Sequence, residues 1–262
     1  MQNIFTQIYE IQTPEEAQQV VAAGVDHIGS VVVSGKEWKQ PLIKETIRFV
    51  EQSKAKSSLI LLFNDQATVF SALDYYRPDM VHFCEVLMDT HMENTVEKVC
   101  RPLIDLQKKI RKNFPKIKIM RTIPIPINGG LNEVPFLDLA KLFEPVSDYF
   151  LTDTLIAGDA EGKNQPVDGY VGITGKTCDW QAAAKLVDAS RIPVILAGGL
   201  SCENVFDGIM TVKPAGVDSC TMTNACDDSG APIRFKKDME KVKKFVKEAK
   251  RALNSIKSMP LT

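Results

Sequence analysis

The chain has 262 residues, of which 44% are hydrophobic and 25% are charged, and its formal net charge is -1. This length and composition allow a sizeable core, and α/β barrels of about 250 residues are routinely single domains. Lysines and arginines are scattered among acidic residues and form no basic face, so neither nucleic acid nor a membrane surface is an expected partner.

The six cysteines form no Cys-x-x-Cys pair, and none lies near the three histidines at metal-ligand spacing. We therefore expect reduced thiols, no metal site and no other cofactor. No apolar run approaches the roughly 20 residues that cross a bilayer, and the first residues lack the pattern of a signal peptide. These features predict a cytoplasmic protein.

Short apolar strands alternate with amphipathic helical segments along the whole chain. The expected strands cover residues 3–11, 25–33, 57–63, 79–84, 116–123, 147–153, 192–199 and 215–221. Helix start signals follow at Thr13, at Asp179 and at Ser201. Strict alternation of this kind indicates a closed barrel or a doubly wound sheet in one domain over residues 1–262, with a short polar tail after Leu253.

The connection from Thr154 to Thr174 is unusually long, and long loops in compact domains are often functional, so we expect it to act as a lid. The triplet Gly-Lys-Thr follows this connection directly, at residues 175–177. It resembles the end of a nucleotide-binding P-loop. The P-loop needs a glycine five positions before that Gly, and this position is Tyr170. The triplet is therefore not expected to bind a nucleotide.

Four segments of the C-terminal half carry a resemblance to a known family. "IPVILAGGLSCENVFDGIMTVKPAGVDSCT" (192–221), followed by "RFKKDMEKVKKFVKEAK" (234–250), resembles the last third of phosphoribosylanthranilate isomerases. "LTDTLIAG" and "GITGKTCDW" (151–158 and 172–180) resemble the strand-six segment of that family. The resemblance implies a TIM (β/α)8 barrel that binds a phosphorylated small molecule, and it leaves a monomer or a homodimer open.

In such barrels, the loops after the last strands and the helix N-termini hold a phosphate. Glycine at a strand end lets the backbone come close to phosphate oxygens, because no Cβ obstructs it. The residues expected at the phosphate are Gly172, Gly175, Gly198, Gly199 and Ser219. The alternative is that these glycines only form tight turns.

The reaction of the family is an Amadori rearrangement, in which an acid opens the sugar ring and a base removes the C2 proton. The resemblance places the acid at Asp153. The family's base is the cysteine of a Lys-Ile-Cys-Gly motif, but this chain has Tyr9 at that position, and a phenol with a pKa near 10 is a poor base. Glu10 and Cys84 are the substitute candidates, although a cysteine that ends a buried strand is often only an apolar filler.

A second departure follows strand two, where the family has a Lys-Arg-Tyr turn whose arginine meets the anthranilate carboxylate. Here Glu37 aligns with that arginine. Lys36, beside it, and Arg121, which ends strand five, are candidates for recognising the substrate anion. The alternative for Arg121 is a salt-bridged residue at the rim of the barrel.

Three functions remain open from the sequence. The first is an isomerase acting on a phosphosugar. It is either the phosphoribosylanthranilate isomerase of tryptophan biosynthesis with a substituted base, or a divergent relative for which phosphoribosylanthranilate is a poor substrate. The second is a lyase or aldolase acting on a phosphorylated substrate through a Schiff base on Lys118. The third is a noncatalytic barrel that binds a phosphometabolite or a protein partner.

Overall fold

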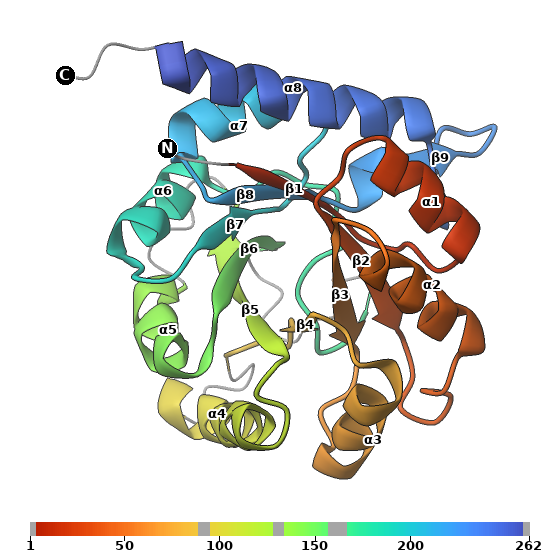
Figure 1. The fold of residues 1–262 in the computed structure, drawn as a ribbon. Helices are drawn as coiled ribbons and strands as arrows, with labels where there is room; N and C mark the ends of the chain where they lie inside the picture. The colour runs from red at the N-terminus through yellow and green to blue at the C-terminus, as the bar shows by residue number, and fades with distance from the viewer. Residues whose placement is uncertain (1–3, 89–94, 128–133, 157–166, 259–262) are drawn as a thin grey trace.

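The computed structural model describes residues 4–88, 95–127, 134–156 and 167–258. Eight parallel strands form a closed barrel with the helices outside it, and β8 pairs with β1 to complete the ring (Figure 1). The barrel strands are β1 (Phe5–Ile8), β2 (His27–Val32), β3 (Lys56–Leu61), β4 (Met80–Phe83), β5 (Lys118–Pro126), β6 (Tyr149–Leu155), β7 (Val194–Leu196) and β8 (Gly216–Ser219). The helices are α1 (Pro14–Ala22), α2 (Pro41–Glu51), α3 (Gln66–Tyr76), α4 (Val96–Asn113), α5 (Phe136–Phe143), α6 (Trp180–Ala189), α7 (Val205–Val212) and α8 (Met239–Ser258), with 3-10 turns at Glu144–Val146 and Thr221–Thr223.

Every expected strand overlaps one barrel strand, so the TIM (β/α)8 barrel is confirmed and the doubly wound sheet is excluded. The strands were visible in the sequence because those of a parallel barrel are buried on both faces and are rich in Val, Ile and Leu. The large apolar core lies between the barrel strands and the helices that surround them.

Side-chain caps begin two of the helices where the sequence predicts them. The hydroxyl of Thr13 accepts a hydrogen bond from the backbone N–H of Glu16, at the start of α1. The carboxylate of Asp179 caps α6, because it accepts from two backbone N–H groups of the first turn. At the third signal, the helix begins four residues after Ser201. At the other end of the chain, α8 continues to Ser258, so the helix includes the first residues of the expected polar tail.

A hairpin that the sequence did not reveal lies between β8 and α8. Its strands are β9 (Asn224–Cys226) and β10 (Pro232–Lys237). Glu10, just after β1, holds this hairpin with a buried carboxylate, which accepts from Arg234 Nε at 2.7 Å and from Asn224 Nδ2 at 3.3 Å. Glu10 has a φ of +64°, a strained conformation for a residue with a side chain. The hairpin is thus fastened to the mouth of the barrel, beside α1 and α8 in Figure 1.

No helix in the described parts of the chain is both long enough and apolar enough to span a membrane. Within the same residues, no three His, Cys, Asp or Glu side chains gather as a metal site requires.

Candidate active site

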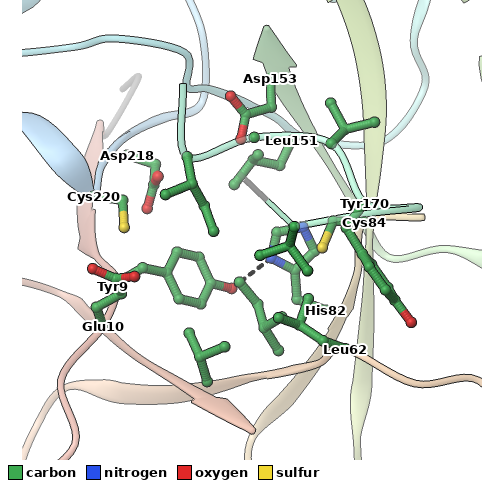
Figure 2. A pocket seen from close by; sticks show the side chains of 16 residues that line it. Tyr9, Glu10, Leu62, His82, Cys84, Leu151, Asp153, Tyr170, Asp218 and Cys220 are labelled. Atoms are coloured by element: carbon green, nitrogen blue, oxygen red, sulfur yellow. Dashed lines mark hydrogen bonds between the residues drawn. The ribbon is translucent and has the colours of Figure 1, made fainter. Parts of the chain in front are cut away.

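Two adjoining cavities open at the carboxyl ends of the barrel strands. The central cavity has a volume of about 50 Å³, and its walls include the aliphatic side chains of Val31, Ile60, Leu62 and Leu151 (Figure 2). The glycine-rich cavity, of about 30 Å³, lies against the turns that follow β6, β7 and β8. Active sites of TIM barrels lie at this end of the strands.

Three glycines, Gly175, Gly198 and Gly199, are part of the wall of the glycine-rich cavity, and at two of them a side chain has no room. Gly198 and Gly199 have φ values of +91° and +59°, in the left-handed region. A Cβ on Gly199 would lie 2.5 Å from the backbone carbon of Lys176, and one on Gly198 would lie 2.5 Å from Thr154 Oγ1. That hydroxyl also donates to the carbonyl of Lys176 at 2.6 Å, so the two turns are packed backbone against backbone.

The other expected phosphate residues lie around the same space. Gly175 and Ser219 line the glycine-rich cavity, whereas Gly172 lines the central one. Ser219 is buried, and its hydroxyl donates to the carbonyl of Leu200 at 2.7 Å, which ties β8 to the turn after β7. The structure therefore brings all five expected residues to two adjoining cavities.

Four residues line both cavities and mark the boundary between them: Asp153, Ile173, Asp218 and Cys220. Asp153 lies near the carboxyl end of β6, and its carboxylate is so close to Gly172 that a Cβ there would be 2.2 Å from Oδ2. Asp218 projects from β8 and accepts a hydrogen bond from Gln7 Nε2 at 3.1 Å. In Figure 2 both carboxylates face the cavity, with Leu62 across from them.

Burial changes the acidity of both carboxyl groups. It raises the pKa of Asp153 to about 6, against the opposing effect of a hydrogen bond from the backbone of Thr154. Burial also raises the pKa of Asp218, to about 8, and the nearby charge of Asp153 adds to this rise. Between these two pKa values, the pair holds one proton, so one group can donate a proton while the other accepts one.

The sequence analysis missed Asp218. The signal was present in "AGVDSCT", where an aspartate comes at the end of an apolar strand, just as Asp153 does in "YFLTD". Polar residues at the carboxyl ends of barrel strands face the active site when their side chains point inward. Only the register of β8 shows that this aspartate points inward.

Tyr9, at the position of the family's cysteine, is part of a buried polar chain. Its hydroxyl lies 2.6 Å from Ser58 Oγ and 2.8 Å from His82 Nδ1, and His82 Nε2 lies 2.8 Å from Thr122 Oγ1. Burial raises the pKa of Tyr9 well above its usual value and lowers that of His82 to about 3, so both side chains are neutral. The Tyr9 ring lies flat against Gly29, where a Cβ would be 2.1 Å from it.

The two substitute bases also line the central cavity. Burial opposes ionisation of Glu10, but Lys237 and Arg234 outweigh it and hold the Glu10 pKa below its usual value. Burial raises the pKa of Cys84, and the neighbouring Glu85 raises it further, so the thiol does not ionise readily. Neither group has a pKa near 7, whereas a general base works best with one near the operating pH.

Arg121 lines neither cavity. Its guanidinium lies on the outer side of β5, where it pairs with Glu85 at 2.5 Å and donates to Gln107 of α4. It also lies over the rings of Phe83 and Phe143. The alternation of side chains along a strand explains this placement, because Thr122, the next residue, points inward to His82. The structure does not bring Arg121 to either cavity.

Two other basic residues also lie away from the cavities. Lys36 is exposed in the turn after β2 and lines neither of them. Lys118, the Schiff-base candidate, is the first residue of β5, with a side chain that is 58% exposed and paired with Asp148. The expectation that Lys118 lies inside the barrel is wrong, because it sits at the opposite end of the strand from both cavities.

Of the long loop expected to form a lid, residues 157–166 lie outside the described residues. The described part after them runs across the end of β4. The backbone N–H of Val171 donates to the carbonyl of Cys84 at 2.8 Å, and that of Val86 donates to the carbonyl of Gly169 at 2.9 Å. Tyr170 thereby becomes part of the wall of the central cavity (Figure 2).

Known proteins resemble this chain in both sequence and fold. Residues 147–248 match the family described as N-(5'phosphoribosyl)anthranilate (PRA) isomerase. N-(5'-phosphoribosyl)anthranilate isomerase 2 of Methanosarcina mazei is 30% identical over 261 residues, which cover 96% of each chain. Isomerase 1 of the same organism is 26% identical over 248 residues, or 91% of each chain. The crystal structure of the phosphoribosylanthranilate isomerase of Thermotoga maritima aligns with a TM-score of 0.66 at 20% identity, over 95% of this chain and all of that one, and so shares the fold.

Proposed function

This chain belongs to the phosphoribosylanthranilate isomerase family, and we propose that it isomerises an N-linked derivative of ribose 5-phosphate at the mouth of its barrel. The observation that carries the proposal is the placement of two carboxylic acids, Asp153 and Asp218, on the boundary of the two cavities. A ligand with its phosphate in the glycine-rich cavity would place its sugar carbons at this boundary.

The phosphate would bind to backbone rather than to cationic side chains. Gly198 and Gly199 expose the turn after β7, and Gly175 exposes the turn before α6. Backbone N–H groups in left-handed turns are a common way to hold a phosphate. A phosphate dianion at this place would raise the pKa of both Asp153 and Asp218, which line this cavity, and so favours keeping a protonated acid for ring opening.

The two acids supply both proton transfers of an Amadori rearrangement. One carboxylic acid protonates the ring oxygen, the bond from that oxygen to C1 breaks, and the ring opens to a protonated imine. The other group, as a carboxylate, removes the proton from C2, and the resulting enol becomes the ketose. The proton lost by one group is balanced by the proton gained by the other. Asp153 is the acid by family resemblance, which leaves Asp218 as the base. This assignment requires the bound ligand to move the shared proton to Asp153 from Asp218, whose pKa is the higher of the two without ligand.

The proposal includes poor turnover of phosphoribosylanthranilate itself. Tyr9 stands where the family has its thiol, and it is a neutral, hydrogen-bonded part of the barrel interior. Glu37 stands where the family has its arginine, and it does not line either cavity. Losing a charged hydrogen bond to the substrate carboxylate costs about 1.5 to 3 kcal/mol of binding.

The test measures the conversion of N-(5'-phosphoribosyl)anthranilate and of N-(5'-phosphoribosyl)aniline by the protein. The appearance of the C2 ketone in NMR spectra reports the rate of each conversion. We expect the wild-type protein to convert the aniline derivative, and we expect Asp153→Asn to convert it about 10²- to 10⁴-fold more slowly. Asparagine preserves the size of the side chain and can still accept the hydrogen bond from Thr154, so loss of folding is not expected.

If the wild type converts neither compound faster than Asp153→Asn does, the isomerase proposal is wrong. Calorimetry with ribitol 5-phosphate then distinguishes a noncatalytic phosphate-binding barrel from a protein without the phosphate site. Binding without turnover would favour the noncatalytic barrel, and an absence of binding would remove the phosphate site as well.

A further inference from the structure

We propose that the central cavity binds an uncharged, apolar substituent of the substrate, so that the group linked to the sugar carries no carboxylate. This inference rests on the proposed function, because it concerns the half of the same ligand that lies away from the phosphate. It is independent of which residue transfers which proton.

The lining of the central cavity is apolar where the substituent would lie. Val31 comes from β2, Ile60 comes from β3 and Leu62 follows β3, and Leu151 comes from the inward face of β6. The phenol of Tyr9 points its hydroxyl away to Ser58 and His82, so its ring presents carbon atoms to the cavity (Figure 2). Apolar groups gain free energy when they leave water for such walls.

The ionisable residues of the lining are acidic or neutral. The carboxylic acids are Glu10, Asp153 and Asp218, and none of the described residues that line the cavity is a lysine or an arginine. His82 is the one described histidine there, and burial lowers its pKa to about 3, so it carries no positive charge near neutral pH. Among the described lining residues, none would bring a positive charge to a carboxylate placed in this cavity.

Three described basic residues whose partners lie at or beside the cavity wall are held by those partners. Arg234 pairs with Glu10 at 2.7 Å, and Lys237 donates to the carbonyl of Cys220 at 2.9 Å and to Asn224. Arg121 pairs with Glu85 on the outer side of the strands. Turning any of these side chains toward a ligand would leave a buried carboxylate or carbonyl without its partner, which is costly.

The chemistry of the cavity therefore discriminates against a charged substituent. A carboxylate placed there would lose its hydration and gain no charged partner, whereas a phenyl or alkyl group has no hydration to lose. We expect at least about a tenfold difference in affinity between ligands that differ only by the carboxylate.

The experiment compares matched ligands by calorimetry with the wild-type protein. The first pair is reduced 1-(o-carboxyphenylamino)-1-deoxyribulose 5-phosphate and its phenylamino counterpart. The second pair carries 2-carboxyethylamino and propylamino groups, which are narrower. Ribitol 5-phosphate, which has no substituent, reports on the phosphate half alone. The uncharged member of each pair is expected to bind at least about tenfold more tightly than the charged member.

A variant pair tests the same point from the side of the protein. Leu62→Arg places a cation on the wall of the cavity and should reverse the preference toward the carboxylate-bearing ligands. Leu62→Met, of similar volume, should leave the preference as in the wild type. Circular dichroism and thermal unfolding establish that each variant is folded, and Val31→Lys replaces Leu62→Arg if that variant is not.

Equal or tighter wild-type binding of a carboxylate-bearing ligand in either pair overturns the inference. So does failure of both uncharged ligands to bind more tightly than ribitol 5-phosphate, because the cavity would then add nothing to binding. A lack of binding by ribitol 5-phosphate itself has a different meaning, since it contradicts the phosphate site and therefore the proposed function.

Discussion

The two halves of the barrel mouth are built differently. Around the ends of β6, β7 and β8, the walls are glycine turns packed backbone against backbone, and this region lies within the residues that match the isomerase family. Around the ends of β1 to β4, the walls are side chains, and Tyr9 stands there in the place of the family's cysteine. The halves can differ in this way because each strand of a TIM barrel contributes its own loop to the site.

The difference shows which part of a ligand each half can specify. A turn that binds through its backbone depends on the left-handed conformation of its glycines, and few substitutions preserve it. A wall made of side chains changes its chemistry with a single substitution, while the barrel beneath it stays the same. The phosphate half is therefore expected to be intolerant of mutation, and the other half is expected to set the substrate.

The largest effect should come from adding a methyl group to the phosphate half. In Gly199→Ala, the new Cβ would lie 2.5 Å from the backbone of Lys176, at a φ of +59°, so the turn must shift. We expect a loss of about 3 kcal/mol of unfolding free energy, and binding of ribitol 5-phosphate weakened at least about tenfold. Denaturant unfolding and calorimetry measure the two effects.

The matched control for Gly199→Ala is Gly169→Ala, which has a φ of +77° but no atom within 4 Å of the new Cβ. It should cost only the backbone strain, roughly 1 to 2 kcal/mol, and should leave phosphate binding unchanged. Equal effects of the two alanines on binding would contradict the idea that close packing of the two turns shapes the phosphate site.

Tyr9→Phe tests the other half of the mouth, with a smaller expected effect. The ring remains, but Ser58 and His82 each lose a buried hydrogen-bonding partner, so the unfolding free energy should fall by about 1 to 3 kcal/mol. Turnover of N-(5'-phosphoribosyl)aniline should fall by less than about threefold, because the phenol is a wall and not the base. A loss of about 10²-fold or more, as removal of a general base produces, would assign the proton transfer to Tyr9 instead.

The control for Tyr9→Phe is Tyr75→Phe, at a half-buried tyrosine of α3 on the outside of the barrel. It removes the same hydroxyl group from a place remote from both cavities. Its unfolding free energy should change by less than about 0.5 kcal/mol.

Asp218→Asn should change how the stability of the protein depends on pH. The pKa of Asp218 rises from 3.8 to about 8 on folding, so the folded state binds more protons than the unfolded state between these values. This contribution to stability is present below pH 3.8 and is lost as the pH rises through about 8. Asparagine cannot ionise and can still accept the hydrogen bond from Gln7, so the variant escapes the loss.

Thermal unfolding between about pH 5 and about pH 9 measures the effect of Asp218→Asn. The melting temperature of the variant, relative to the wild type, should increase with pH by at least about 3 °C. A difference that stays constant with pH would show that Asp218 is not a buried acid with a raised pKa.

The sequence predicted the strands, helix caps and turns around the site better than it predicted which side chains enter the site. The eight strands, the caps at Thr13 and Asp179, and the glycine-rich turns were all readable, because they depend on patterns within a few neighbouring residues. Arg121 and Lys118 show where this reading fails. Both lie on β5, one facing away from the barrel interior and the other at the wrong end of the strand. Neither fact follows from the presence of a basic residue in an apolar run.

The sequence by itself determined the order of strands and helices, the barrel class and the family, because hydrophobic periodicity and capping are local properties of the chain. Tertiary structure decided which side chains meet. The register of each strand selects which residues point inward, and a shift of one residue reverses them all. Closure of the barrel brought Asp218 of the last strand to the same cavity boundary as Asp153, and it brought Glu10 of the first strand to a hairpin more than 200 residues away. Contacts at that separation are fixed only when the ring closes, because no local pattern in the sequence records them.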